Sequence, residues 1–352
     1  MGHWVRLRGW INERLVGRSV GLSLLLLLVL VSTLVALGSG RYAVGFWNTL
    51  EFFGTTLGLA QMEADQFELL YSVLIEIRLP RVLAALLLGA ALAASGAAFQ
   101  GVFRNPLVSP NLLGVLSGSA FGAVLGMLLG GGWLVVQLMA FVFGLIAVAL
   151  ALSIAHTFGK GSLIMLVLGG ILSSALFAAL VSTLKYVADP YNELPVITLW
   201  LMGSLASVDL DEILWAAIPM GLTMLLLCLS GRWLDALAMG DDEARTLGVP
   251  VTLVRYGVIA GAALLGALTV SLAGMIGWIG LIVPHIARLI CGPSQCRVLP
   301  VSILLGASFL VWADLLARSL TDSEIPIGIV TELLGIPVFL LVLRRTRKSW
   351  ES

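Results

Sequence analysis

The chain is divided into apolar segments of about 20 residues, separated by short polar stretches. A helix of about 20 apolar residues crosses the roughly 30 Å hydrocarbon layer of a bilayer. Backbone groups in lipid must be hydrogen-bonded within the protein, so such segments must be helical. The sequence therefore predicts an all-α polytopic membrane protein with about ten transmembrane helices, at residues 20–37, 81–102, 111–130, 133–158, 162–187, 213–230, 253–272, 275–290, 301–320 and 327–343.

The composition excludes several other classes of protein. Hydrophobic residues make up 59% of the chain and charged residues 11%, against roughly 45–50% and about 25% in soluble proteins. So few charges cannot cover the surface of a soluble enzyme, and disorder requires low hydrophobicity with high charge. The 20 basic and 20 acidic residues cancel, so no net field attracts nucleic acid. The first apolar segment is long for a signal peptide and other apolar segments follow it, so we interpret it as an uncleaved helix.

The distribution of basic residues predicts the orientation of the chain. Cytoplasmic flanks of membrane proteins carry an excess of Lys and Arg, and basic residues both precede the first apolar segment and follow the last. Both termini are therefore expected in the cytoplasm, which requires an even number of spans. We divide the chain into a cytoplasmic segment (1–19), one transmembrane domain (20–343) and a cytoplasmic tail (344–352). With ten spans, five basic residues lie on the outer side: Arg41, Arg78, Arg81, Lys185 and Arg318.

Two outer segments are too long to be simple turns. Residues 38–79 contain several aromatic side chains, which are typical of membrane–water interfaces. The segment is either a periplasmic cap with aromatic anchors or a plain surface loop. Residues 196–206 are almost all apolar, which favours a short re-entrant or amphipathic helix within 190–209.

One inner segment, residues 232–252, has the pattern of a short capped helix. Asp241 and Asp242 suit the positive N-terminal end of a helix, and Gly248 suits its termination. A short helix between two spans on the cytoplasmic face has the form of a docking element for a partner. An ordinary structured loop fits the same pattern.

The motifs of known catalytic and nucleotide-binding sites are missing from the sequence. It contains no G-x-x-x-x-G-K-[ST] phosphate loop, no H-E-x-x-H and no nucleophile elbow. The three cysteines and three histidines are scattered, so no metal site is predicted. Two acids lie inside predicted spans, Asp314 and Glu332. Asp314 precedes Arg318 by four residues and is expected to pair with it, and two isolated acids are a poor proton relay.

Several segments resemble one family of membrane proteins, and they occur in that family's order and spacing. The family comprises the FecCD-type permeases of binding-protein-dependent ABC importers for iron–siderophores, haem and vitamin B12. The matching segments are RLPR (78–81), GVFRNPLVSPNLLG (101–114), GDDEARTLG (240–248), GMIGWIGLIVPHIAR (274–288), ADLLAR (313–318) and EIPIGIVTELLG (324–335). The resemblance extends from about residue 78 to about residue 344.

This resemblance implies a type II ABC importer permease fold with ten helices per subunit. Two permease subunits, identical or similar, would enclose the translocation path at their interface. Two separate ATPase subunits would bind ATP and Mg, and this chain would bind no cofactor and catalyse no covalent step. The resemblance implies that the ATPases contact a coupling loop, which corresponds here to Gly240, Asp241, Glu243, Arg245, Leu247 and Gly248.

The resemblance also assigns the outer partner and the gate. A periplasmic substrate-binding protein would dock on Arg78, Arg81 and Arg318. The alternatives for these arginines are snorkelling at the membrane edge and the pairing of Arg318 with Asp314. The cytoplasmic gate would lie near Ser162 and Leu163.

The implied function is import across a bacterial or archaeal cytoplasmic (inner) membrane. The cargo is expected to be a metal chelate, an iron–siderophore first, with haem, cobalamin or molybdate as further candidates. The competing hypothesis is a stand-alone secondary transporter or channel. That class has a polar site at the bilayer midplane, formed by broken helices, and Gly277 and Pro284 are the features that hint at it.

Overall fold

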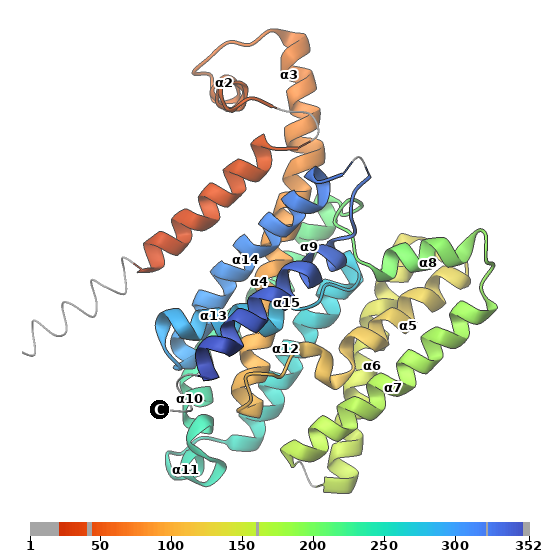
Figure 1. Cartoon of the computed structure of the whole chain (residues 1–352), viewed down its shortest axis with the longest axis vertical. Coiled ribbons are helices and arrows are strands. Elements are labelled where there is room, and N and C mark those ends of the chain that lie inside the picture. The colour runs from red at the N-terminus through yellow and green to blue at the C-terminus, as the bar shows by residue number, and fades with distance from the viewer. Residues whose placement is uncertain (1–20, 41–43, 160–161, 322, 348–352) are drawn as a thin grey trace, which may run out of the picture.

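The computed structural model describes residues 21–40, 44–159, 162–321 and 323–347. Every regular element among these residues is a helix and none is a strand, which confirms the predicted fold class (Figure 1). The elements are Gly21–Gly38, α2 (Phe46–Thr56), α3 (Ala64–Tyr71), η1 (Ser72–Arg78), α4 (Leu79–Phe103), η2 (Pro110–Leu113), α5 (Val115–Leu128), α6 (Trp133–Gly159), α7 (Leu163–Val187), α8 (Glu193–Leu201), α9 (Leu210–Leu229), α10 (Gly231–Met239), α11 (Asp241–Thr246), α12 (Val251–Ala273), α13 (Ile279–Cys291), α14 (Gln295–Ser319) and α15 (Ile327–Arg347).

Ten apolar helices correspond to the ten predicted spans. Within the described residues, 7 helices are long and apolar enough to cross a membrane. Three shorter apolar helices, Val115–Leu128, Ile279–Cys291 and Ile327–Leu341, occupy the remaining predicted positions. The described residues thus contain an apolar helix at each of the ten predicted positions, and the differences concern helix boundaries.

Four helices begin four or more residues away from the predicted start. The ninth begins at Gln295 rather than at residue 301, and in the other three local backbone geometry interrupts or extends the apolar pattern. The second span does not begin at Arg81: the helix is continuous over Ala64–Phe103, through the π-helical turn η1. The third begins only after Gly114, whose φ of 83° separates η2 from α5. The eighth begins at Ile279, because residues 274–278 are not helical.

The segment that follows the first helix forms a helical cap rather than a plain loop. Phe52 of α2 stacks on Phe67 of α3 at 5.1 Å between ring centroids, and both adjoin a small core of Val44, Leu70 and Leu74. Figure 1 shows this cap projecting beyond the bundle at one extremity, which we call the α3 end. The apolar stretch near residue 200 forms the predicted short helix, α8.

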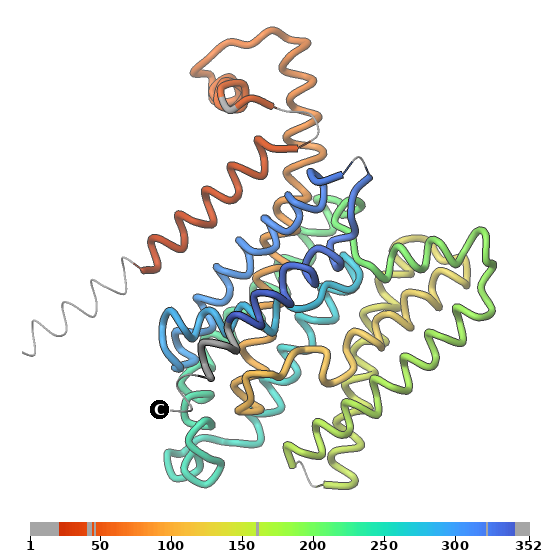
Figure 2. The backbone as a smooth tube through the Cα atoms, in the orientation of Figure 1, coloured from red at the N-terminus to blue at the C-terminus, as the bar shows by residue number. Residues whose placement is uncertain are grey.

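The bundle is built around α4, whose apolar stretch is 83% buried. Helices α12, α13 and α14 pack on α4, and α5, α6 and α7 form a second group beside them (Figure 2). Glycines permit the closest crossings: a Cβ at Gly96 would overlap the carbonyl group of Gly280, and one at Gly89 would overlap that of Gly306. Small residues at such crossings let helices in lipid approach closely.

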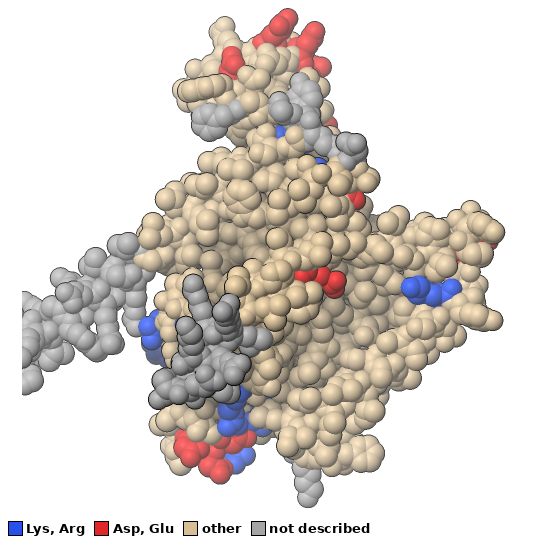
Figure 3. Space-filling model, in the orientation of Figure 1, with Lys and Arg blue, Asp and Glu red and all other residues tan. Residues whose placement is uncertain are grey.

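Charged side chains gather at the two extremities of the molecule. Figure 3 shows acidic groups on the cap and a mixture of acidic and basic groups around α10 and α11, which we call the α11 end. The surface between them is almost uncharged in this view. Many apolar side chains on the long helices between the two ends are exposed, among them Leu172 of α7 and Leu222 of α9. This band has the character of a surface in contact with lipid.

Candidate functional site

Helix α11 begins and ends as its sequence predicts. Asp241, Asp242 and Glu243 occupy its first turn. At its other end the Val249 amide donates to the Ala244 carbonyl (3.0 Å) and the Gly248 amide to the Arg245 carbonyl (2.9 Å). With Gly248 at φ 80°, this is a Schellman termination. The buried Ala244 fixes the helix to the rest of the protein, so α11 is a defined helix at the surface.

Asp241 connects α11 to two long helices. Its Oδ1 and Oδ2 accept hydrogen bonds of 2.7 Å from Arg255 Nη2 on α12. Arg104, directly after α4, forms an ion pair with the same carboxylate. We call Asp241, Arg104 and Arg255 the latch. Through the latch, a force on α11 reaches both α4 and α12.

The surroundings of Asp241 keep its carboxylate ionised. Partial burial raises its pKa, but hydrogen bonding and charge from Arg255, with the charges of Arg104 and Arg245, outweigh that effect, so the pKa lies below its ordinary value of 3.8. The stabilisation that the ion pairs contribute is full above about pH 4 and is lost as the pH falls through the lowered pKa. The latch therefore does not titrate near neutral pH.

Other side chains in and directly after α11 are exposed to solvent. The Asp242 side chain is 90% exposed and that of Arg245 61% exposed, and the two form an ion pair of 2.9 Å. Leu247, an apolar residue, is also exposed. A helix fixed by one side and displaying charges and a leucine on the other can bind a partner protein.

The predicted gate residues lie next to the latch. Ser162 and Leu163, at the start of α7, line a cavity of about 360 Å³ together with Asp241, Arg245 and Arg255. The structure thus brings together two sites that are separated by about 80 residues in the sequence. Lys160 and Gly161, which precede the gate residues, lie outside the described residues.

At the α3 end, two of the three predicted docking arginines hold the C-terminal end of the first helix. Arg78 donates a hydrogen bond of 2.6 Å to the Leu37 carbonyl, and Arg318 donates one of 2.5 Å to the Ala36 carbonyl. Carbonyls at a helix end lack helical partners and favour cations. We call this arrangement the arginine clasp.

The third arginine, Arg81, bridges two acids. Its Nε lies 2.7 Å from Asp314 Oδ1, and its Nη1 lies 2.9 Å from Glu324 Oε2. Asp314 Oδ2 also lies 3.3 Å from Arg318 Nε, which confirms the pairing expected from their spacing. Arg81 is thus a second, unpredicted partner of Asp314.

The three arginines are less exposed than docking residues on an open face would be. Arg78 is 5% exposed and Arg318 6%, and the Arg81 side chain is 12% exposed. An arginine in an apolar bundle needs compensating carbonyls or carboxylates, and this requirement draws the side chains inward. Glu324, with 36% of its side chain exposed, is the part of this cluster most open to solvent.

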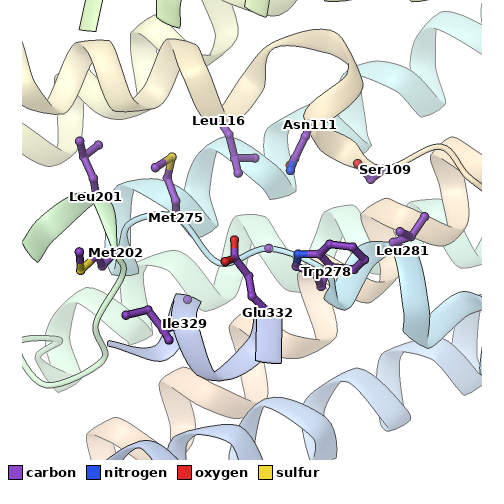
Figure 4. A pocket seen from close by; sticks show the side chains of 12 residues that line it. Ser109, Asn111, Leu116, Leu201, Met202, Met275, Trp278, Leu281, Ile329 and Glu332 are labelled. Atoms are coloured by element: carbon purple, nitrogen blue, oxygen red, sulfur yellow. The ribbon is translucent and has the colours of Figure 1, made fainter. Parts of the chain in front are cut away.

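A cavity of about 440 Å³ opens between α5, the end of α8, α13 and α15. Figure 4 shows the Glu332 carboxylate of α15 projecting toward the non-helical segment 274–278, with Trp278 and Asn111 beside it. Met202 and Met275 also line the cavity. Among the described residues that line it, Glu332 alone carries a charge.

The non-helical segment of this cavity is held in an unusual conformation. Trp278 has a φ of 68°, a value that costs energy for a bulky residue and that is concentrated at functional sites. Its ring makes an edge contact with Phe339 of α15, with 6.2 Å between centroids. A Cβ at Gly335 would lie 2.8 Å from Trp278 Cβ, so only a glycine permits this approach.

Sequence reasoning missed Arg104, Arg255 and Trp278 as site residues. Arg104 lies within one of the family-like segments, and Arg255 is a rare charge in an apolar stretch, so a signal existed for both. The backbone conformation of Trp278 has no such signal. Among the residues that the structure describes, no group of three or more His, Cys, Asp or Glu side chains is placed to hold a metal ion.

Comparisons with known proteins yield concordant similarities. The model of the FecCD transport family matches residues 26–345. The molybdate import system permease protein MolB of Haemophilus influenzae is 39% identical over 326 residues, or 92% of this chain and 95% of that protein. An iron chelatin transport system permease protein of Helicobacter pylori is 38% identical over 284 residues, covering 80% and 86% of the two chains. A solved structure, described as an inward-facing conformation of a metal-chelate type ABC transporter, superposes with a TM-score of 0.82 at 38% identity, covering 92% of this chain and 98% of that one.

Proposed function

Because the chain belongs to the FecCD transport family, we propose that it is the membrane permease subunit of an ABC importer. The resemblance seen in its motifs is confirmed by that membership. Related permeases import molybdate and iron chelates, and we infer that this chain imports a metal chelate, an iron–siderophore first, with haem, cobalamin or molybdate as further candidates. The membrane would be the cytoplasmic membrane of a bacterium or archaeon.

The observation that carries this proposal is the latched helix α11. Its outward side chains supply a docking surface, and its Asp241 is tied to α4 and α12. We propose that one ATPase subunit docks on α11 of each of two permease subunits. Because the sequence has no phosphate-binding loop, ATP and Mg would bind to the ATPases, and this chain would catalyse no covalent step.

The path would open and close through the cavity that the latch and the gate share. Asp241 and Leu163 both line it, so a displacement of α11 would change the space next to the start of α7. At the opposite end, a substrate-binding protein would dock near Arg78, Arg81 and Arg318. Since these arginines already have partners, carboxylates of the binding protein would have to compete with Glu324 and with the carbonyls of the first helix.

Co-purification with the ATPase subunits tests this proposal. The tagged chain should retain its ATPase partners in detergent, and replacement of residues 241–247 by a Gly-Ser linker of equal length should abolish their retention. A matched control replaces residues 57–61 of the cap in the same way and should leave retention unchanged. Retention of the ATPases by the α11 replacement would reject α11 as their docking site.

The competing hypothesis is a stand-alone secondary transporter. One observation favours it: the non-helical segment beside Glu332 resembles the broken helices of such transporters. The family comparisons fit the importer instead. The two hypotheses differ in whether transport requires ATP hydrolysis.

A further inference from the structure

The cavity beside Glu332 contains an acid whose role the ATPase-coupling scheme leaves unexplained. Glu332 is an exposed residue of α15, whose segment Ile327–Leu341 is one of the shorter apolar helices. Among the described residues, no Lys or Arg forms an ion pair with it. An acid at membrane depth is costly to maintain and commonly marks a pathway for ions or substrate.

The remaining lining suits a cargo that is partly apolar and positively charged. The Trp278 ring presents a π system, which attracts cations when they lie over its face. The Met202 and Met275 side chains add polarizable apolar surface, and Asn111 adds an amide that both donates and accepts hydrogen bonds. A free oxyanion would find a carboxylate here and no Lys or Arg among the described lining residues.

The site is also held in place. Glu332, Gly335 and Phe339 follow one another on α15 at helical spacing, and the last two contact Trp278. Helix α15 is fixed at its start by a hydrogen bond of 3.1 Å from the Gly328 amide to the Met202 carbonyl. The Trp278 ring and the helix that carries Glu332 are therefore in place before any cargo arrives.

We propose that Glu332 makes this cavity a cation-selective part of the cargo path, so that the chain imports a chelate bearing positive charge rather than a free oxyanion. That the cavity lies on a cargo path rests on the proposed function, whereas its preference for cations does not.

Charged thiol reagents measure the electrostatic potential of the cavity directly. In a variant of the full complex that lacks Cys228, Cys291 and Cys296, Met275→Cys places a single thiol in the cavity. Its rates of modification by trimethylammonioethyl and sulfonatoethyl methanethiosulfonate are compared at low ionic strength. The ratio of the two rates cancels any effect of Glu332 on the fraction of thiolate.

The ratio should favour the cationic reagent and should fall about 10-fold in Glu332→Gln, because a cleft of one charge sign changes the local concentration of ions by at least that factor. Two controls are matched to this measurement. Glu68→Gln removes an exposed acid of the cap and should leave the ratio unchanged. For a thiol introduced by Leu59→Cys, on the exposed turn of the cap, the ratio of the two rates should not change in Glu332→Gln.

An unchanged ratio in Glu332→Gln would overturn the proposal, as would a Met275→Cys thiol that neither reagent modifies in any state of the transport cycle. ATP-dependent uptake by the same complex is measured separately. If uptake does not require ATP but the ratio of modification rates still depends on Glu332, the importer is rejected and the cation-selective cavity is retained. If uptake requires ATP but the ratio does not depend on Glu332, only the cavity proposal is rejected.

Discussion

Asp241 and Asp242 are neighbours in the sequence with opposite surroundings. Asp241 accepts hydrogen bonds from Arg255 on α12 and pairs with Arg104. Asp242 is 90% exposed and pairs only with Arg245 of the same short helix, within the described residues. Exposed pairs of this kind contribute about 0–1 kcal/mol, whereas hydrogen bonds to a charged group contribute about 1.5–3 kcal/mol. Function should therefore depend on the first aspartate and hardly on the second.

The first prediction compares these two residues. Asp241→Ala should reduce the cargo transported per ATP hydrolysed by about 10-fold, because a loss of about 1.5–3 kcal/mol in the latch leaves α11 free to move without α4 and α12. Asp242→Ala should remain within about twofold of the wild type. Both values come from parallel assays of uptake and ATP hydrolysis in proteoliposomes. If Asp241→Ala transported as much cargo per ATP hydrolysed as the wild type, the latch would have no part in coupling ATP hydrolysis to transport.

At the scale of elements, the first helix depends on side chains from two other elements. Only 17% of this helix, Gly21–Gly38, is buried, so packing holds it weakly. Trp312 of α14 donates a hydrogen bond of 3.0 Å to Ser32 Oγ, and the arginine clasp binds its last carbonyls. Any side chain at Gly40 would approach the Arg78 guanidinium within 2.8 Å. The clasp therefore positions the first helix beneath the cap.

The second prediction concerns the clasp as a docking surface. Arg78→Glu combined with Arg318→Glu should weaken association of the binding protein about 10-fold or more at low salt, since like charges across an interface lower the association rate. Lys185→Glu, which reverses a basic residue outside the clasp, serves as the control. Surface plasmon resonance on the complex in nanodiscs measures both. If the binding protein associated equally well with the double variant and with the wild type, these arginines would have a structural role and no role in docking.

The elements show how far a sequence determines such a fold. The positions of the spans follow from the length of apolar segments, and α11 follows from Asp241, Asp242 and Gly248. The 40-residue helix Ala64–Phe103 was not predicted, because the polar residues of the cap conceal its helical continuation. The pair of Asp241 with Arg104 in the latch and the Arg81 bridge to Asp314 join residues more than 100 positions apart. Contacts at such separations are set by tertiary packing, which local patterns do not encode.

At the scale of the whole molecule, the small number of charges is sorted by position. Acidic groups lie on the cap, and mixed charges lie around α10 and α11 (Figure 3). Two charged clusters, the arginines with Asp314 and the latch, lie at opposite ends of α4, which extends from Leu79 to Phe103. A single buried helix thus connects the proposed docking sites of the binding protein and the ATPases. This arrangement suits a subunit that couples docking of a binding protein on one side of a membrane to ATP hydrolysis on the other.

In the proposed function, transport through this chain is driven by ATP hydrolysis in partner subunits. Uptake of a radiolabelled iron–siderophore is measured in proteoliposomes that contain the permease, with the ATPases, the binding protein and ATP each omitted in turn. Uptake is expected only when all are present, and it should be lost with the Gly-Ser replacement of residues 241–247. Uptake at an undiminished rate without ATP or without the ATPases would contradict the proposed function.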